Sequence, residues 1–443
     1  MRPLIRRWFC SKLIRRIESS EKVNLPPRAA SRGLKVTRLK PVQLRMRGWM
    51  GLLAWLLAAS LSGASGVHSN PLNRDPLVRE AYEHFYNLDY PGAVARFERV
   101  YAAHPGDPQA TALLLNAEIF QELYRLDLLD TTFYANDGFL TGRHATEEDA
   151  ATHDRILGLA DEAIREATWR IDHNSSDVDA LFSRGWTYSL KCTYLAMVER
   201  SYGAGFRLAT KARDDELRVL ELDPEYVDAK LVAGVYEYVV GALPWPFKML
   251  IGFAGITGSK SDGLALLNDA ANRGVITRVE ARTVIALFLR REARYKEAIE
   301  DVRGLRNLYP HDYLFCLEEA NLLKDAGEGM VAVDAYREIL AKSAHPGYFA
   351  EARLELAYFG LGDALRGQRH YNEAAEAYER AAWTRSVGPE LKIRSLLAGG
   401  ECRDLNGERP LALKDYQMAI DAGPNTSRAD TARKFLHTPY RGN

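Results

Sequence analysis

The segment Gly252–Ser261, GFAGITGSKS, contains the residue types of a phosphate-binding loop. In such a loop, GxxxxGK[ST], backbone N–H groups surround the phosphates and a lysine directly follows the last glycine. Here Gly252 and Gly258 are one residue too far apart, and Ser259 separates Gly258 from Lys260. No β-strand is expected before the segment, as the motif would require. The spacing therefore argues against a nucleotide site.

The other residue types that could support catalysis or metal binding show no recognised spacing. The chain has 10 histidines, but they form no HExxH pair, and no GxSxG nucleophile elbow occurs. His144 and His153 share one polar region, yet they are too far apart in sequence to indicate joint ligation. We therefore expect no catalytic residues, no metal and no cofactor.

The 4 cysteines indicate neither a disulfide framework nor a zinc site. Cys10 lies in a basic leader, and Cys192, Cys316 and Cys402 are scattered without a CxxC pair. We expect the last three to be buried thiols that pack as small hydrophobic side chains.

The formal net charge of zero averages two unlike parts of the chain. Residues 1–47 contain 14 Lys and Arg against 2 Asp and Glu, which leaves 45 basic and 57 acidic residues in the remainder. A nucleic-acid-binding protein needs a basic surface. The acidic remainder therefore argues against nucleic acid as a partner.

An uncharged stretch, Gly48–Val67, follows the basic leader. Its most apolar part, Leu52–Leu61, is short for a bilayer span and is followed by small residues. This profile predicts a signal peptide or signal anchor over residues 46–66, with cleavage after Ala64 or Gly66. We expect the rest of the chain to be exported to the periplasm or cell envelope.

Residues 1–45 have two interpretations. A start at Met46 would give a compact signal peptide, so that the preceding residues would be a start-site overcall. Alternatively, apolar residues near helical spacing among arginines form a basic amphipathic leader, which is typical of membrane surfaces and mitochondrial presequences. If the leader is retained and Gly48–Val67 acts as a signal anchor, the positive-inside rule keeps the leader in the cytoplasm. The remainder of the chain would then still cross the membrane. Mitochondrial and cytoplasmic locations are the alternatives.

The elements that must position any binding residues are helical hairpins, best seen in Glu351–Trp383. Two predicted helices carry small residues, Gly362 and Ala374, where they cross closely, and tyrosines fill the space around the crossing. The spaced positions are Tyr358, Leu361, Gly362, Leu365, Tyr371, Ala374, Tyr378 and Ala381. The stretch resembles the tetratricopeptide repeat, W-x₂-L-G-x₂-Y…Y-x₂-A-x₃-F-x₂-A. The resemblance implies an all-α fold, an α-α superhelical solenoid of tetratricopeptide-type helical hairpins.

Similar marker residues elsewhere predict an array along the chain. The expected divisions are irregular N-terminal repeats at 73–276, insertions at 130–150 and 239–263, a regular array at 279–426, and a capping helix and tail at 427–443. The helices between Ala180 and Pro224 are longer than the repeat requires, which predicts an enlarged hairpin. Thr426 or Ser427 is the expected N-cap of the final helix.

The run Val239–Ile256, VVGALPWPFKMLIGFAGI, departs most from the repeat pattern. Two prolines interrupt it, so a straight membrane-spanning helix is not expected. One interpretation is an inserted helix buried against the repeats, and the other is an exposed patch in which Trp245 and Phe247 dock on a membrane or a partner. Residues 239–274 faintly resemble tetratricopeptide proteins associated with the mitochondrial outer membrane, which implies membrane association.

Tetratricopeptide repeats bind an extended peptide or a partner helix in a groove lined by their first helices. In this sequence the resemblance places the groove positions at Phe359, Asp363 and Arg366 in one repeat and at Arg394, Leu397 and Glu401 in the next. These positions lack the Lys/Asn clamp that one subclass uses for a C-terminal carboxylate. Their mixed apolar and acidic character favours a basic or amphipathic partner segment.

These observations predict a non-catalytic protein–protein interaction scaffold of the periplasm or cell envelope. One alternative is a membrane-associated assembly factor that docks through the apolar residues 239–256. Another is an enzyme whose site lies in the irregular central region, around residues 130–150 and 245–263.

Overall fold

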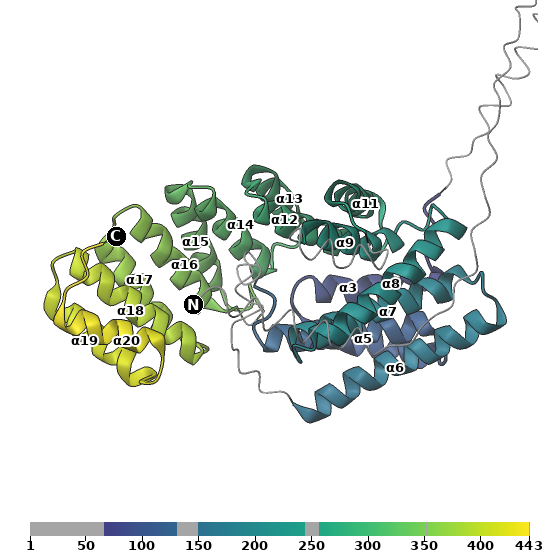
Figure 1. The fold of residues 1–443 in the computed structure, drawn as a ribbon, viewed down its shortest axis with the longest axis horizontal. Helices are drawn as coiled ribbons and strands as arrows, with labels where there is room; N and C mark the ends of the chain where they lie inside the picture. Colours follow the sequence, from purple (N-terminus) through teal and green to yellow (C-terminus); the bar gives the residue numbers. More distant parts are fainter. Residues whose placement is uncertain (1–65, 131–148, 244–256, 351, 443) are drawn as a thin grey trace, which may run out of the picture. The chain divides into compact units, whose positions relative to one another are not determined.

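The computed structural model describes residues 66–130, 149–243, 257–350 and 352–442, and within these ranges the chain is helical and has no β-strand (Figure 1). The helices are η2 (Pro71–Arg74), α3 (Pro76–Phe85), α4 (Tyr90–Ala103), α5 (Pro108–Arg125), α6 (Ala150–His173), α7 (Val178–Met197), α8 (Tyr202–Leu222), α9 (Ala229–Ala242), α11 (Lys260–Arg273), α12 (Arg278–Arg291), α13 (Tyr295–Leu308), α14 (Tyr313–Asp325), α15 (Gly329–Ser343), α16 (Leu354–Gly367), α17 (Tyr371–Trp383), α18 (Pro389–Leu405), α19 (Arg409–Ala422) and α20 (Ser427–His437).

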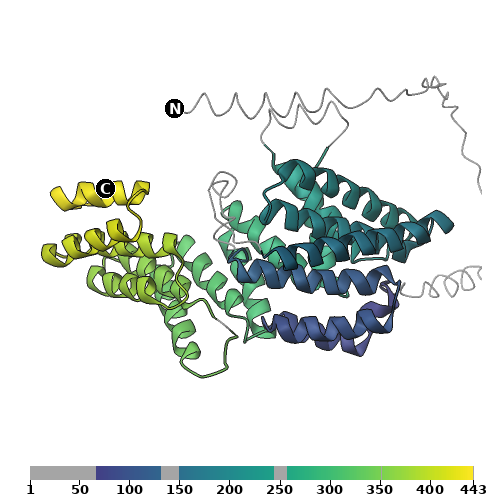
Figure 2. The same ribbon diagram turned by 90° about the horizontal axis from the view of Figure 1, so that it is seen from below.

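Consecutive helices pack as hairpins, which confirms the predicted all-α solenoid of tetratricopeptide type (Figure 2). In the α16–α17 hairpin, a Cβ on Gly362 would lie 2.7 Å from ring carbons of Tyr378. Gly400 and Tyr416 repeat this relationship in the α18–α19 hairpin, where the distance would be 2.6 Å. Glycine is therefore needed at the crossing because the tyrosine ring occupies the space of a side chain.

The regular hairpins share one turn geometry. A residue with positive φ stands two positions before the second helix: Leu88 (φ 62°), Ala293 (57°), Gly327 (82°), Arg369 (64°) and Gly407 (80°). This left-handed conformation lets the backbone reverse within a short turn, and glycine adopts it without steric cost. In three of the five turns this position is not glycine, so the side chain adds a steric cost. Glycine alone therefore does not identify the turns in this sequence.

The middle of the chain contains the longest helices. Helix α6 has 24 residues, and α7 and α8 have 20 and 21, against 14 residues in each of α12 and α13. The predicted enlarged hairpin is therefore present as α7–α8. The polar stretch predicted at 130–150 falls largely on residues 131–148, which lie outside the described residues.

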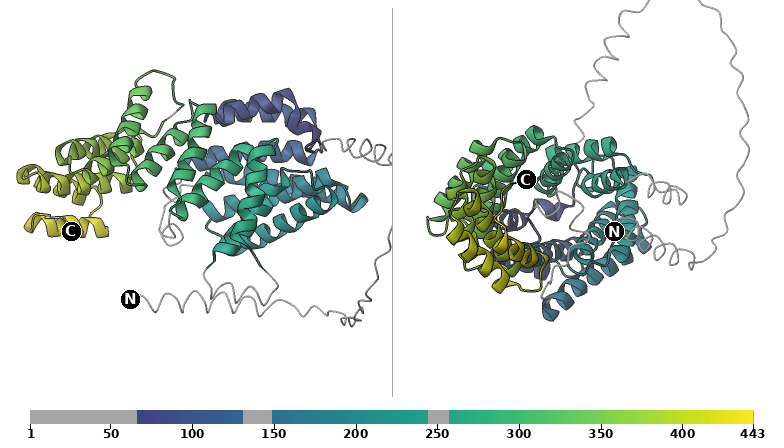
Figure 3. Two further views of the ribbon diagram at one scale, coloured as in Figure 1. Left: turned by 90° about the horizontal axis from the view of Figure 1, so that it is seen from above. Right: turned by 60° about the vertical axis from the view of Figure 1, so that its left-hand side comes forward.

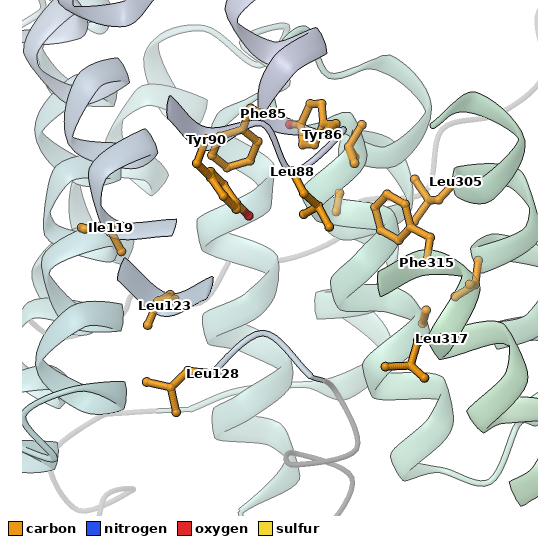
Figure 4. Close-up of a cluster of buried hydrophobic side chains, with 14 of the residues drawn as sticks. Phe85, Tyr86, Leu88, Tyr90, Ile119, Leu123, Leu128, Leu305, Phe315 and Leu317 are labelled. Carbon is orange, nitrogen blue, oxygen red and sulfur yellow. The ribbon is translucent and has the colours of Figure 1, made fainter. Parts of the chain in front are cut away.

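The first hairpin, α3–α4, packs against helices much later in the chain. Tyr86, in the turn after α3, lies with its ring centroid 5.1 Å from that of Tyr309. Figure 4 shows Leu88 on the side of Phe315 and Leu305, and Figure 3 gives two further views of the stacked hairpins. In helix α14, which is the first helix of its hairpin, every residue from Phe315 to Leu323 is buried. The side chains of α14 are therefore largely closed to a partner.

Other long-range contacts fasten the N-terminal part of the described chain. His68 N–H donates to the Glu225 carbonyl at 3.0 Å, and the Ser69 hydroxyl donates to Asp228 at 2.7 Å. Beyond α5, Asp127 forms a 2.7 Å ion pair with Arg353, the residue before α16.

Helix α20 ends the array. The Thr426 hydroxyl accepts a hydrogen bond from the Ala429 N–H at 3.2 Å, which confirms Thr426 as the N-cap. Of its residues, Ala429 and Ala432 are buried against the preceding hairpin, and the opposite face is polar. The division of the chain at residue 276 into irregular and regular repeats stays a prediction.

Candidate functional site

Helix α16 carries three of the predicted groove residues on one face. Phe359, Asp363 and Arg366 follow one another at intervals of four and three residues, and all are half-buried. Asp363 accepts a hydrogen bond from the Tyr378 hydroxyl at 2.6 Å and lies 3.5 Å from the Lys324 ammonium. This carboxylate is therefore satisfied by its own hairpin and by the preceding one.

Helix α18 brings the other three predicted residues next to the first set. The Arg394 guanidinium lies over the Phe359 ring at 4.6 Å, and Glu401 forms a 2.7 Å ion pair with Arg366. Leu397 is half-buried and packs against the C-terminal apolar cluster. The six residues thus form one area, here called the α16–α18 surface: Phe359, Asp363, Arg366, Arg394, Leu397 and Glu401.

The charges of the α16–α18 surface are largely internal pairs. Burial raises the pKa of the Glu401 carboxyl, and the guanidinium of Arg366 opposes that rise. Arg394, in contrast, is exposed. Because its two carboxylates are already paired, the surface offers less attraction to a basic partner than the sequence indicated.

The C-terminal tail reaches the same surface, a contact that the sequence did not reveal. The Tyr440 hydroxyl accepts a hydrogen bond from Arg366 at 3.0 Å, and the backbone N–H of Tyr440 donates to Asp404 at 2.7 Å. The Tyr440 ring also lies edge-on to Phe435 at 5.3 Å. The tail therefore covers the end of the α16–α18 surface nearest Arg366 and leaves Phe359, Arg394 and Leu397 uncovered by these contacts.

Trp245 and Phe247, the other predicted contact residues, lie outside the described residues. The preceding helix α9 ends at Ala242, and Val239 on it is 47% exposed. Among the described residues, no helix has the length and apolar character needed to cross a membrane. Docking through residues 239–256 stays a prediction.

The end of the glycine-rich segment caps a helix. Ser259 is the N-cap of α11, and its hydroxyl accepts from the Asp262 N–H at 3.3 Å. The Lys260 ammonium forms a 2.7 Å ion pair with Glu292 and lies over the Tyr238 ring. The last described element before this segment is the helix α9, whereas a phosphate-binding loop would follow a strand; residues 244–256 lie outside the described residues.

Two of the three predicted buried thiols are buried and the third is half-buried. Cys316 and Cys402 are buried and Cys192 is intermediate, and all three are free. Burial raises the pKa of the Cys316 and Cys402 thiols to about 12, so both stay protonated near neutral pH. In the described part of the chain, no group of three or more His, Cys, Asp or Glu is placed to hold a metal ion.

A cavity of about 200 Å³ lies where the α3–α4 hairpin meets α12, α13 and α14 (Figure 4). Its walls are mainly apolar and include Phe85, Leu88, Phe120, Leu305, Phe315 and Leu317. Its polar lining residues are mostly carboxylates: Asp130, Glu280, Asp312 and Glu318. Sequence reasoning missed this cavity because its walls come from segments nearly two hundred residues apart, and no local motif marks it.

Comparison with known proteins finds likeness only among solved structures. No family model and no curated protein matches the chain. The APC/C hetero-tetramer Cut9–Hcn1 is 13% identical with a TM-score of 0.44, and the match covers 87% of this chain and 58% of that one. The chain therefore spans less than two thirds of that protein's length.

Two further structures have similar helical arrays. A tetratricopeptide repeat protein from Parabacteroides merdae is 15% identical, with a TM-score of 0.32 and coverage of 74% of this chain and 100% of that one. Yeast Tom70 is 12% identical, with a TM-score of 0.33 and coverage of 82% and 87%. The tetratricopeptide-type fold is shown by the packing of the hairpins described above.

Proposed function

We propose that the chain is a non-catalytic protein-interaction scaffold that binds an amphipathic peptide segment or partner helix on the α16–α18 surface. The observation that carries this proposal is a difference in exposure between equivalent helices. On α14, every residue from Phe315 to Leu323 is buried, whereas Phe359 and Leu397 are half-buried and Arg394 is exposed. The residues of α14 are therefore closed to a partner, whereas α16 and α18 keep accessible side chains.

The chemistry of the surface favours an amphipathic partner. Phe359 and Leu397 offer apolar area, and Arg394 offers a cation that can pair with an acidic group of the partner. Burial of apolar side chains in the centre of such a contact supplies most of its binding energy, while rim charges set register and specificity. A partner with apolar residues on one face and a carboxylate beside them meets both requirements.

Selection of displayed peptides against the full chain tests this proposal. Peptides that bind the wild-type chain should bind Arg394→Glu and Leu397→Ser at least about tenfold more weakly, because each change removes a contact worth roughly 1.4 kcal/mol or more. Arg385→Glu, in the exposed turn before α18, is the charge-matched control and should leave Kd unchanged. Peptides that bind all four proteins equally would place the binding surface elsewhere.

We also propose export to the periplasm or cell envelope with cleavage after Ala64 or Gly66. The support is the uncharged profile of Gly48–Val67 together with the hydrogen bond that fixes His68 to the turn after α8. A mature chain beginning at residue 65 or 67 would keep every contact described here. N-terminal sequencing of the native protein tests this, and an intact Met1 on the soluble protein would overturn it.

A further inference from the structure

The cavity beneath the α3–α4 hairpin lies apart from the α16–α18 surface and plays no part in the proposed peptide binding. Protein interiors are normally packed as densely as organic crystals, so an apolar space of about 200 Å³ forfeits many van der Waals contacts. An apolar cavity of roughly 150 Å³ is known to stay dry and to accept a molecule of the size of benzene. The space is therefore large enough for a small organic ligand.

The polar part of the lining has a single sign of charge. Asp130, Glu280, Asp312 and Glu318 line the cavity, and among the described lining residues there is no Lys, Arg or His. Glu318 is paired with the buried Arg290 at 3.0 Å. A ligand that carried a negative charge would meet these carboxylates, and Arg290 already pairs with Glu318.

Glu280 is the carboxylate with spare hydrogen-bonding capacity. Its Oε1 accepts from the Tyr86 hydroxyl at 2.6 Å, whereas Oε2 is buried and has no hydrogen-bond partner among the described residues. Leaving a buried acceptor without a donor is unfavourable, so a ligand donor that reached Oε2 from the cavity would satisfy it. Burial also raises the pKa of Glu280 and of Asp312 to about 7, as expected for carboxyl groups that lack a nearby cation.

We propose that this cavity binds a small amphiphilic amine, with its apolar body between Phe85, Leu88 and Phe315 and its ammonium group donating to Glu280. The apolar walls provide affinity by burying the body of the ligand. The unpartnered carboxylate oxygen provides selectivity, because an ammonium donates to it and neutralises it at once. The site is distinct from any groove that holds a peptide.

Three probes that share a phenylethyl body separate the contribution of the head group. We expect 2-phenylethylammonium to bind the full chain with one saturable site in isothermal titration calorimetry. 2-Phenylethanol, which donates without charge, should bind at least about tenfold more weakly, and 3-phenylpropanoate should show no saturable binding. Equal binding of all three probes, or no saturable binding of the amine, would overturn the proposal.

Two variants locate the site. Glu280→Gln keeps an acceptor for Tyr86 and removes the charge, so the preference for the amine over the alcohol should fall at least about tenfold. Glu297→Gln, on the exposed face of α13, is the matched control and should retain the full preference. Val284→Phe places a ring in the cavity and should abolish binding of the amine. If Val284→Phe fails to fold, Glu280→Gln still decides, and unchanged selectivity in that variant would contradict the proposal.

Discussion

The Tyr86 hydroxyl donates a 2.6 Å hydrogen bond to Glu280, although 194 positions separate the two residues in the chain. The phenol thereby joins the first hairpin to α12, and the Tyr309 ring packs beside it. In an ideal linear solenoid, each repeat contacts only its neighbours. This pair is therefore part of a tertiary closure that the repeat pattern does not require.

Removal of this hydrogen bond should destabilise the chain. Tyr86→Phe keeps the ring packing but leaves Oε1 of the buried Glu280 carboxyl without its donor. We expect a loss of about 1–3 kcal/mol in the free energy of unfolding, which is the usual cost of an unsatisfied buried acceptor. Urea unfolding followed by circular dichroism measures it.

Tyr371→Phe is the control, because this half-buried tyrosine starts α17 far from the closure. Its unfolding midpoint should stay close to that of the wild-type chain. If the Tyr86 and Tyr371 variants were equally stable, the long-range hydrogen bond would contribute nothing measurable.

Replacement of two glycines of α16 by alanine should change the stability of the chain in opposite directions. At Gly362, a Cβ would lie 2.7 Å from the Tyr378 ring, so Gly362→Ala should cost about 1–3 kcal/mol through overpacking. At Gly367, nothing lies within 4 Å of the added Cβ, so Gly367→Ala should be neutral or stabilising by up to about 1 kcal/mol. Thermal unfolding of the two variants compares them, and a loss at Gly367 as large as that at Gly362 would refute the packing explanation.

Glu216 in α8 should make stability depend on pH. Its side chain is fully buried, and neither carboxyl oxygen has a hydrogen-bond partner among the described residues. Burial, followed by the nearby Asp215 and Asp228, raises its pKa well above the ordinary value of 4.5. The folded chain therefore binds this proton more tightly than the unfolded chain does.

The sign of the effect follows from that difference. The contribution of the Glu216 proton to the free energy of unfolding is fully present below about pH 4.5 and is lost as pH rises towards the folded-state pKa. It amounts to about 1.4 kcal/mol for each unit by which the folded-state pKa exceeds the unfolded-state pKa. Glu216→Gln removes the titration, so its stability relative to the wild-type chain should increase from pH 5 to pH 8. Urea unfolding across this range tests the prediction. Glu221 is exposed on the same helix, so the stability of Glu221→Gln should change with pH as that of the wild-type chain does.

The repeat itself could be predicted from local spacing. Gly362 and Tyr378 are 16 positions apart, and the hairpin that joins them is held by contacts within that short stretch. The Thr426 cap is equally local, because its hydroxyl accepts from the N–H group three residues later. Such features are readable from one sequence because the residues that make them are neighbours in it.

The covering of α14 and the cavity beside it could not be predicted in this way. Leu317 and Phe315 have the apolar character of an ordinary repeat helix, and nothing near them in sequence indicates that α3–α4 packs on that side. The acidic groove positions attract a basic partner less than expected for a similar reason, since the cations that pair with Asp363 and Glu401 come from other helices, α14 and α16 respectively.

The contacts of the first hairpin with Glu280 and Tyr309 also have a consequence for how the chain folds. During synthesis the first hairpin emerges early, yet the two residues to which the Tyr86 hydroxyl donates follow it by 190 and 194 positions. Contacts of such large sequence separation slow folding, since the intervening chain must be ordered first. The apolar side of α3–α4 therefore stays uncovered during that interval, when exposed apolar surface favours aggregation.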